Sequence, residues 1–388
     1  MNFGLLIRQA LSKSSLPDDA SHLEIARNEG NFIIEDLWYK TKSKYRQSRG
    51  SVITVAGADE YVLNKYFDEF VKHTLQGSST NPRYLEYKEP EEFFRVIRLQ
   101  HATSGNPYIY TFGDIVGFDQ QISVATVVRV FSSLASKGSD NVNFVTGSDR
   151  VTSSVNLFNL NDVGRRIRKS GDTRTYKVGK YISQTEIQLL EKYRGTTASS
   201  VAYALGDVGI RVNVQGYVGG QIDSEDIELD GSNVIVSTKT FNQIVSVSKS
   251  DRTGGNITVE NSAATVTIGT MAPGETEIER QTVILWPKPD TAETLPFRFF
   301  MKHPILWLDS DRPLIRSKWH RLIAYKLEKR LREAFDKQVQ QGLIDDITEA
   351  QYQFENEAED MSLTDTVPDG DARRHGDQFL YDKDEDFY

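Results

Sequence analysis

The stretch SKWHRLIAYKLEKRLREAFDKQV, residues 317–339, has the hydrophobic spacing of an amphipathic helix. Ser317 can act as its N-cap, and Gly342 follows its end. His320 lies in this helix, where we expect it to be partly exposed and not to act as a base. The apolar positions recur every three or four residues: Trp319, Leu322, Ile323, Leu327, Leu331, Ala334, Phe335 and Val339.

Helices are also predicted at the start of the chain and after the stretch above. A first helix contains Leu5–Leu11 and stops before Pro17, and a second begins with Ser21 as N-cap and runs to Gly50. A capping box at Thr348–Gln351 predicts a last helix to about Met361. Helices at both ends predict one helical domain that the two chain ends close together.

The residues between these helices favour β-structure. From Ser51 to Ser136 the apolar residues alternate, with strands predicted at Val52–Val55, Tyr108–Phe112 and Ile122–Phe131 and one helical turn at Pro90. The predicted fold is therefore α+β, with two small β-barrel or sandwich modules inserted into a β-rich domain. The predicted parts are helices 1–50 packed with 313–361, a β-rich domain of 51–137 with 276–312, a small β module 138–206, an Ig-like sandwich 207–275, and an acidic arm 362–388.

Charge is distributed unevenly along the 388 residues. The chain has 46 Lys and Arg against 55 Asp and Glu, a net charge of −9. Residues 355–388 hold twelve acids and three bases, so the rest of the chain is neutral. A neutral body with an acidic end argues against a general nucleic-acid coat. No apolar run approaches the ~20 residues that a membrane helix needs, so we expect no membrane contact.

The sequence shows no recognisable motif for catalysis or for metal or cofactor binding. There is no cysteine, and no two histidines have the spacing of metal ligands on a helix. Asp309–Asp311 and Asp382–Asp386 are interpreted as a turn and a solvated tail, because neither continues into a calcium-binding loop. The basic cluster Arg165–Lys169 is interpreted as the outer face of a strand, and Gly216–Gly220 lacks a phosphate-binding pattern. We therefore predict a protein that is not an enzyme and holds no metal or cofactor.

Several stretches, in their order along the chain, resemble the head-to-tail adaptor (connector) proteins of tailed bacteriophages. The likeness covers most of residues 1–340. Two departures concern turn geometry: Asn64-Lys65 and Arg316 stand where the family commonly has proline. The stretches are TVAGADEYVL at 54–63, PEEF at 90–93, SGNPYIY at 104–110, VTG at 145–147 through NDVG at 161–164 and YRG at 193–195, VILWPKP at 283–289, and DRPLI at 311–315 leading into WHRLI at 319–323.

The resemblance implies a structural protein of the virion neck that joins the capsid to the tail. Such a subunit forms a ring, commonly twelve-fold, beneath the portal protein, and a downstream stopper, tail terminator or tube protein binds below it. The genomic DNA passes through the ring's channel without sequence-specific binding. The resemblance also implies assembly in the host cytoplasm and no catalytic site. Residues 207–275 and the acidic arm look like additions to a minimal adaptor.

Two other classes of protein stay open. One is another tail or baseplate component built of β modules, which would not require helices at both chain ends. The other is a carbohydrate-binding adhesin or enzyme built on β-sandwiches, in which a pair of carboxylates would be expected in a cleft.

The acidic arm is the predicted docking element. Its aromatic and apolar residues offer burial that a merely solubilising tail would not need. A segment this acidic should not order by itself, so we expect it to fold against the portal or a neighbouring subunit. The candidate docking residues are Phe379, Leu380, Tyr381, Phe387 and Tyr388.

Overall fold

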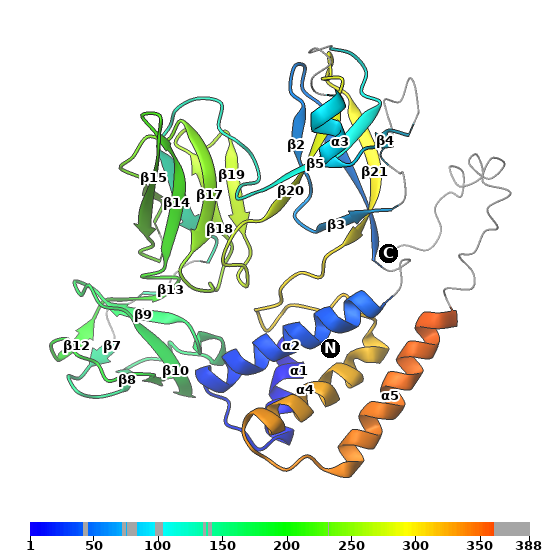
Figure 1. Cartoon of the computed structure of the whole chain (residues 1–388). Helices are drawn as coiled ribbons and strands as arrows, with labels where there is room; N and C mark the ends of the chain where they lie inside the picture. The colour runs from blue at the N-terminus through cyan, green and yellow to red at the C-terminus, as the bar shows by residue number, and fades with distance from the viewer. Residues whose placement is uncertain are drawn as a thin grey trace.

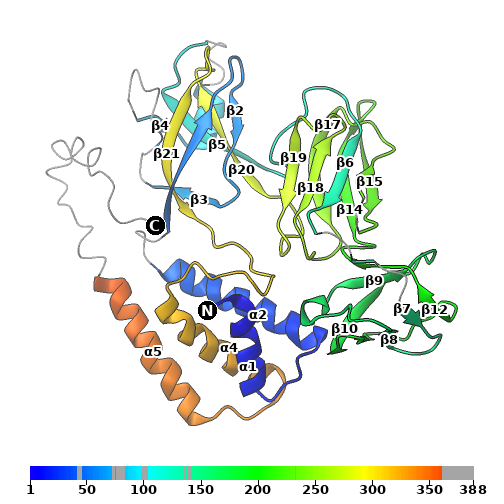
Figure 2. The same ribbon diagram turned by 180° about the vertical axis from the view of Figure 1, so that it is seen from behind.

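The computed structural model describes residues 1–41, 46–71, 75, 84–97, 104–134, 137–138, 142–231 and 233–360. Helix and sheet are mixed, with more residues in strands than in helices, and one of the sheets is a half-barrel. The expected α+β class is confirmed at this coarse level. Figures 1 and 2 show helices α1, α2, α4 and α5 together at the bottom of the view, with the strands above and beside them.

The two N-terminal helices are α1 (Phe3–Lys13) and α2 (Ala20–Lys40). The N-cap of α2 is Asp19, whose carboxylate accepts the backbone N–H of His22 at 3.0 Å, and not Ser21 as predicted. An Asp in this position satisfies a free N–H of the first turn and carries a negative charge toward the helix N-terminus. The predicted end of α2 at Gly50 is also wrong, because Gln47–Ile53 form strand β1.

The C-terminal helices are α4 (His320–Ala334), preceded by a 3₁₀ turn at Ser317–Trp319, and α5 (Gln341–Asp360). The predicted continuation of α4 to Val339 is wrong: Asp336 has φ +52°, a left-handed conformation that ends the helix. The predicted cap at Thr348 is wrong as well, since this residue lies inside α5 and its hydroxyl donates to the Ile344 carbonyl. The chain thus turns earlier than the apolar periodicity suggests, and α5 packs back on α4.

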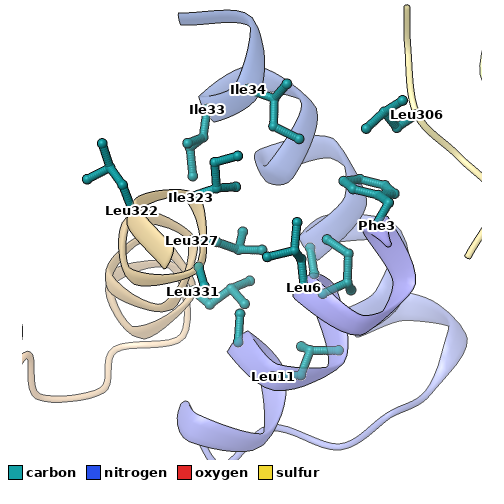
Figure 3. Packing of buried hydrophobic residues seen from close by; sticks show 14 of the residues in the cluster. Phe3, Leu6, Leu11, Ile33, Ile34, Leu306, Leu322, Ile323, Leu327 and Leu331 are labelled. Carbon is teal, nitrogen blue, oxygen red and sulfur yellow. The ribbon is translucent and has the colours of Figure 1, made fainter. Parts of the chain in front are cut away.

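These four helices share one hydrophobic core, and Figure 3 shows the part of it that α1, α2 and α4 form. Leu6 of α1, Ile34 of α2 and Leu327 of α4 are fully buried and belong to it. Trp319 and Phe354 meet edge to face at 5.2 Å and attach α5 to the start of α4. His320 is only 5% exposed, which corrects the prediction of a partly exposed residue. Its Nε2 lies 3.0 Å from the Ile315 carbonyl, a contact that satisfies the buried ring.

Two sheets from both halves of the chain lie above the helices in Figure 1. Their shared core is rich in aromatic rings, with Phe70 stacked on Phe112 at 5.5 Å and edge-on to Phe297 at 5.1 Å. A short helix α3 (Pro90–Glu92) and a π-helical turn (Phe93–Ile97) follow β4. One sheet has the order β2 (Glu60–Val62), β20 (Arg280–Trp286), β5 (Ile109–Val116) and β4 (Glu86–Tyr87), and the other has β1, β21 (Thr294–Met301) and β3 (Phe67–Phe70).

Residues 142–206 form a seven-stranded sheet with its own core. The buried rings of Phe144, Tyr176 and Tyr193 lie in this core, with Tyr193 within 5.2 Å of each of the other two. The 3₁₀ turn Leu160–Asp162 interrupts the strands. The sheet order is β12 (Ala198–Val201), β7 (Val142–Phe144), β8 (Arg150–Ser153), β11 (Glu186–Leu189), β10 (Tyr176–Ser183), β9 (Arg166–Lys169) and β13 (Tyr203–Gly206).

A sandwich of two sheets encloses a further core, which includes Val214, Phe241 and Val259. Val128–Ser132, predicted as part of the strand Ile122–Phe131 and assigned to 51–137, pairs with two strands of this sandwich. Gly219 and Gly220, both at positive φ, form the tight turn of the β14–β15 hairpin, so the Gly-rich stretch is a hairpin turn. One sheet has the order β15 (Gln221–Glu228), β14 (Arg211–Val218) and β17 (Gln243–Lys249), and the other has β16 (Ile235–Val236), β6 (Val128–Ser132), β18 (Ile257–Asn261) and β19 (Thr267–Met271).

Candidate functional site: a junction cavity

A cavity of about 330 Å³ lies where α2, the seven-stranded sheet, the sandwich and the segment 307–310 meet. Both ribbon views show the seven-stranded sheet beside the N-terminal end of α2 and below the sandwich (Figures 1 and 2). Because all three units contribute to one cavity, its residues fix how the units are oriented. The charged residues in its lining are Arg27, Arg165, Arg166, Lys177, Asp207, Asp251, Arg252 and Asp309.

Trp307 stands at the centre of the junction between two guanidinium groups. Arg27 of α2 lies 5.1 Å from the ring centroid and Arg252 of the sandwich 4.3 Å. Burial lowers the pKa of Arg252 below its ordinary value, and its side chain also hydrogen-bonds Asn28. Two cations over one indole ring are stabilised by the quadrupole of the ring. Trp307 therefore links α2 directly to the sandwich.

Asp309 is the anionic partner of the helices at this junction. Its carboxylate accepts from Arg8 at 2.6 Å and from Arg27 at 2.8 Å. Asp311 accepts the backbone N–H groups of Trp307 and Leu308, each at 2.8 Å, and so closes a turn. The interpretation of Asp309–Asp311 as a turn is confirmed. The sequence alone did not indicate that Asp309 would pair with two arginines of the N-terminal helices.

The basic cluster 165–169 joins the seven-stranded sheet to the sandwich. Arg166 donates to Asp251 at 2.9 Å and Arg168 to Glu228 at 2.8 Å. The prediction that this is a solvated outer face is wrong for these two arginines, because strand β9 turns them toward acidic residues of the sandwich. Burial is the largest single influence on the pKa of Asp251 and would raise it. The hydrogen bond from Arg166, the charge of Lys177 and the backbone N–H of Arg252 together outweigh burial, so the pKa of Asp251 is lowered.

Two buried carboxylates hold the neighbouring loops. Asp162, fully buried, accepts from Lys137 at 2.7 Å and from Arg165 at 3.3 Å. Asp207 accepts from the Ser132 hydroxyl at 2.6 Å and from the N–H groups of Gly254 and Gly255 at 2.6 and 3.1 Å. Each carboxylate is thus neutralised or hydrogen-bonded where it lies, as burial of a charge requires.

Lys249 is buried beside this junction at the end of β17. Its Nζ donates to the Thr253 hydroxyl at 2.6 Å and to the Ala272 carbonyl at 2.8 Å. Burial lowers the pKa of Lys249 to about 8, although Asp207 and Glu275 act in the opposite direction.

In the described part of the chain, the Nε of Arg27 is the one fully buried side-chain polar atom in the cavity lining that has no hydrogen-bond partner.

The charged side chains of the junction pair mainly with one another, so these residues hold the units together. The described residues contain no group of three or more side chains suited to hold a metal ion, and none of their helices is long and apolar enough to cross a bilayer. No known family model matches the chain, and comparison with curated proteins gives no match. The predicted docking residues Phe379, Leu380, Tyr381, Phe387 and Tyr388 lie outside the described residues.

Proposed function

We propose that the protein is a structural subunit of a bacteriophage virion, the head-to-tail adaptor that forms a ring beneath the portal. The observation that carries this proposal is the spatial arrangement of the stretches behind the resemblance. Residues 54–63 supply β2, residues 104–110 lead into β5, and residues 283–289 begin in β20. These three strands are neighbours in one sheet in the order β2, β20, β5, although up to 230 residues separate them.

This arrangement supports the proposal because a resemblance by chance would scatter its pieces over the fold. Residues 86–87, just before the PEEF stretch, add β4 to the same sheet next to β5. The stretch 311–323 leads into α4, and the Phe3 N–H donates to the Asp311 carbonyl at 2.7 Å. The first helix of the chain and the last stretch of the resemblance therefore lie side by side.

The proposal includes a finer architecture. Residues 1–50 and 313–361 would form one helical domain closed by the two chain ends, which contacts the portal and neighbouring subunits. Residues 51–137 with 276–312 would form the β-rich adaptor domain, except for strand β6 (Val128–Ser132), which pairs within the sandwich. Residues 138–206 and 207–275 would be inserted modules. A neutral body suits a channel, because a basic lumen would hold the passing DNA electrostatically.

The partners in this proposal are the portal, a downstream stopper, tail terminator or tube protein, and eleven further copies in a twelve-fold ring. The protein would be assembled in the host cytoplasm and reside in the virion neck. It needs no enzyme activity, metal, cofactor or membrane for this role.

Native mass spectrometry and negative-stain imaging of the purified protein, alone and mixed with its portal, test the proposal. We expect a closed ring on the portal with the mass of twelve subunits. A protein that stays monomeric in the presence of the portal would contradict the adaptor role. Assembly into long tubes without the portal would favour a tail component instead.

Deletion of the arm tests its predicted role in docking. Removing residues 363–388 should abolish binding to the portal, while circular dichroism and the melting temperature of the subunit stay unchanged. A truncated protein that binds the portal as well as the full chain would refute docking through the arm.

A further inference from the structure

A groove of about 340 Å³ separates α2 from α5 along the surface of α4. Figures 1 and 2 show α5 beside α4, with the C-terminal ends of α2 and α5 at the same end of the bundle. The groove lies away from the junction cavity and shares no residue with it. Its lining consists of Phe32, Ile33 and Asp36 of α2, Lys326, Lys329, Arg330 and Glu333 of α4, and Ile347 and Gln351 of α5.

The groove combines an apolar surface with a basic edge. The Phe32 ring is 55% exposed, which is unusual for a phenylalanine on a helix that packs in a bundle. The Arg330 guanidinium lies 4.7 Å from the centroid of that ring. With Lys326 and Lys329 on the same helix, the cations outnumber the two acids of the lining. Such a surface suits a partner segment that carries both aromatic rings and carboxylates.

Lys326 is the cation of the groove that has no partner. Its side chain is half-buried, and it makes no hydrogen bond or ion pair with the described residues. Burial lowers the pKa of Lys326 and the neighbouring Lys40 adds to that effect, although the carboxylates of Asp36 and Glu355 act in the opposite direction. A half-buried ammonium that makes no direct ion pair is costly, so an incoming carboxylate in contact with it would gain more here than at an exposed lysine.

The chain itself contains a segment of matching chemistry. Residues 361–388 hold eight acids and three bases, a net charge of −5. Within them, Phe379-Leu380-Tyr381 has Asp377 on one side and Asp382 on the other. The exposed Phe32 ring of the groove can pack against such aromatic rings, while the lysines and the arginine around it attract the carboxylates on either side.

The length of the chain allows this segment to reach the groove. Helix α5 passes the groove at Gln351 and ends at Asp360, about 14 Å further along its axis at 1.5 Å per residue. The eighteen residues before Phe379 can span up to about 60 Å, which is ample for a return. A tether of this length gives an effective concentration in the millimolar range, so even a weak contact would be occupied within one chain.

We propose that, in the free subunit, the arm of the same chain folds back and seats Phe379–Tyr381 in the groove between α2, α4 and α5. In that position Asp377 and Asp382 would face Lys326 and Lys329, and the rings would cover Phe32. This inference goes beyond the adaptor role, because it assigns the arm a first binding site on its own helices. The portal would then have to displace the arm before the two proteins dock.

Disulfide trapping in the free full-length protein tests the proposal, since the chain has no cysteine of its own. A variant with Gln351→Cys in the groove and Gln378→Cys in the arm is oxidised mildly at low micromolar concentration, without portal. We expect an intramolecular disulfide, seen as a monomer of increased mobility on a non-reducing gel. The matched control pairs Gln378→Cys with Lys192→Cys on the exposed surface of the seven-stranded unit, and it should cross-link at least about tenfold more slowly.

A charge reversal tests the recognition. Adding Lys326→Glu and Lys329→Glu to the trapping pair should slow disulfide formation by about tenfold or more, whereas Lys192→Glu should leave it unchanged. Circular dichroism checks that the bundle still folds in each variant. Disulfide-linked dimers would show that the groove binds the arm of a second copy, and trapping no faster than the control would show that the arm does not bind there. Either result overturns the proposal, and neither bears on the portal experiment.

Discussion

His303 makes the attachment of the strands to the helical bundle sensitive to acid. The neutral ring is needed in the folded state, because Nε2 accepts the Leu314 N–H at 3.1 Å while Nδ1 lies 2.7 Å from the Pro304 carbonyl. The ring is also edge-on to Trp38 at 5.5 Å, and the Trp38 indole N–H donates to the Met301 carbonyl at 2.8 Å. Burial lowers the pKa of His303 to about 4, against an ordinary value of 6.5.

The sign and size of the effect follow from this difference in pKa. Between pH 6.5 and pH 4 the unfolded chain binds a proton at His303 that the folded chain does not, so lowering the pH favours unfolding. The stability that the neutral ring contributes is complete above pH 6.5 and is lost as the pH falls toward 4. Between pH 7.5 and pH 5.0 the loss is about 2 kcal/mol, at 1.36 kcal/mol for each unit of pKa difference.

Urea unfolding followed by tryptophan fluorescence at pH 7.5 and pH 5.0 measures this loss in the native chain and in His303→Gln. The variant is less stable at pH 7.5, because the glutamine replaces only part of the contacts of the ring. The stability difference between the two proteins should then shrink by about 2 kcal/mol at pH 5.0, since only the native chain pays for the proton.

The control residue, Asn31 of α2, holds the same loop but does not titrate. Asn31 accepts the Leu306 N–H and donates to the Leu306 carbonyl, both at 2.7 Å. Asn31→Ala should lower the stability by about 1–3 kcal/mol, by the same amount at both pH values. A gap between the native chain and His303→Gln that is equal at pH 7.5 and pH 5.0 would refute the role given to His303.

Two further predictions concern the junction. Burial lowers the pKa of Lys249 to about 8 from 10.5, so the folded state is least stable below pH 8, where the buried amine must carry a charge. The free energy of unfolding of the native chain should therefore rise by about 2 kcal/mol from pH 8 to pH 10. Lys249→Met, compared by urea unfolding, should lack this rise. An equal gain in both proteins would contradict this. Asp309→Asn should lower the stability by about 2–3 kcal/mol, because it leaves Arg27 without its carboxylate and Arg8 with Asp18 alone. Asp36→Asn at the exposed pair with Lys40 should cost under about 1 kcal/mol. Equal losses in a thermal melt would show that the Asp309 pairs do not hold the junction.

The existence of the helices could be read from the sequence, but their ends could not. Helices α2 and α4 carry apolar residues at helical spacing beyond the points where they stop, because Tyr45 and Val339 continue the pattern. What ends α4 is the left-handed conformation of Asp336, and the Phe335 ring before it stacks on His22 at 4.9 Å. Such an end depends on a partner from another helix, which periodicity within one segment does not report.

The sequence does not predict the junction, for a related reason. Its charged members come from residues 8–28, 162–177, 207, 249–252 and 307–311, and no local motif links them. The basic cluster 165–169 was a visible signal, yet the acidic partners of Arg168 and Arg166, Glu228 and Asp251, lie 60 and 85 residues further along the chain in another unit. The sequence shows that residues 165–169 are basic, but only the folded structure shows which acidic residues of the sandwich neutralise them.

The contacts among the units differ in kind, and this difference affects how easily each unit can change its orientation. The seven-stranded sheet contacts the bundle through one ion pair, Lys177 with Glu24 at 2.7 Å, and through buried apolar residues, since Val163 belongs to the bundle core and Tyr181 packs against both cores. Arg166, Arg168 and Arg252 instead carry the contacts of the sandwich described at the junction. Apolar burial resists salt, whereas partly exposed ion pairs weaken as ionic strength rises. The orientation of the sandwich therefore depends more on surrounding charge than that of the seven-stranded sheet, and a charged neighbour in an assembly would act on it first.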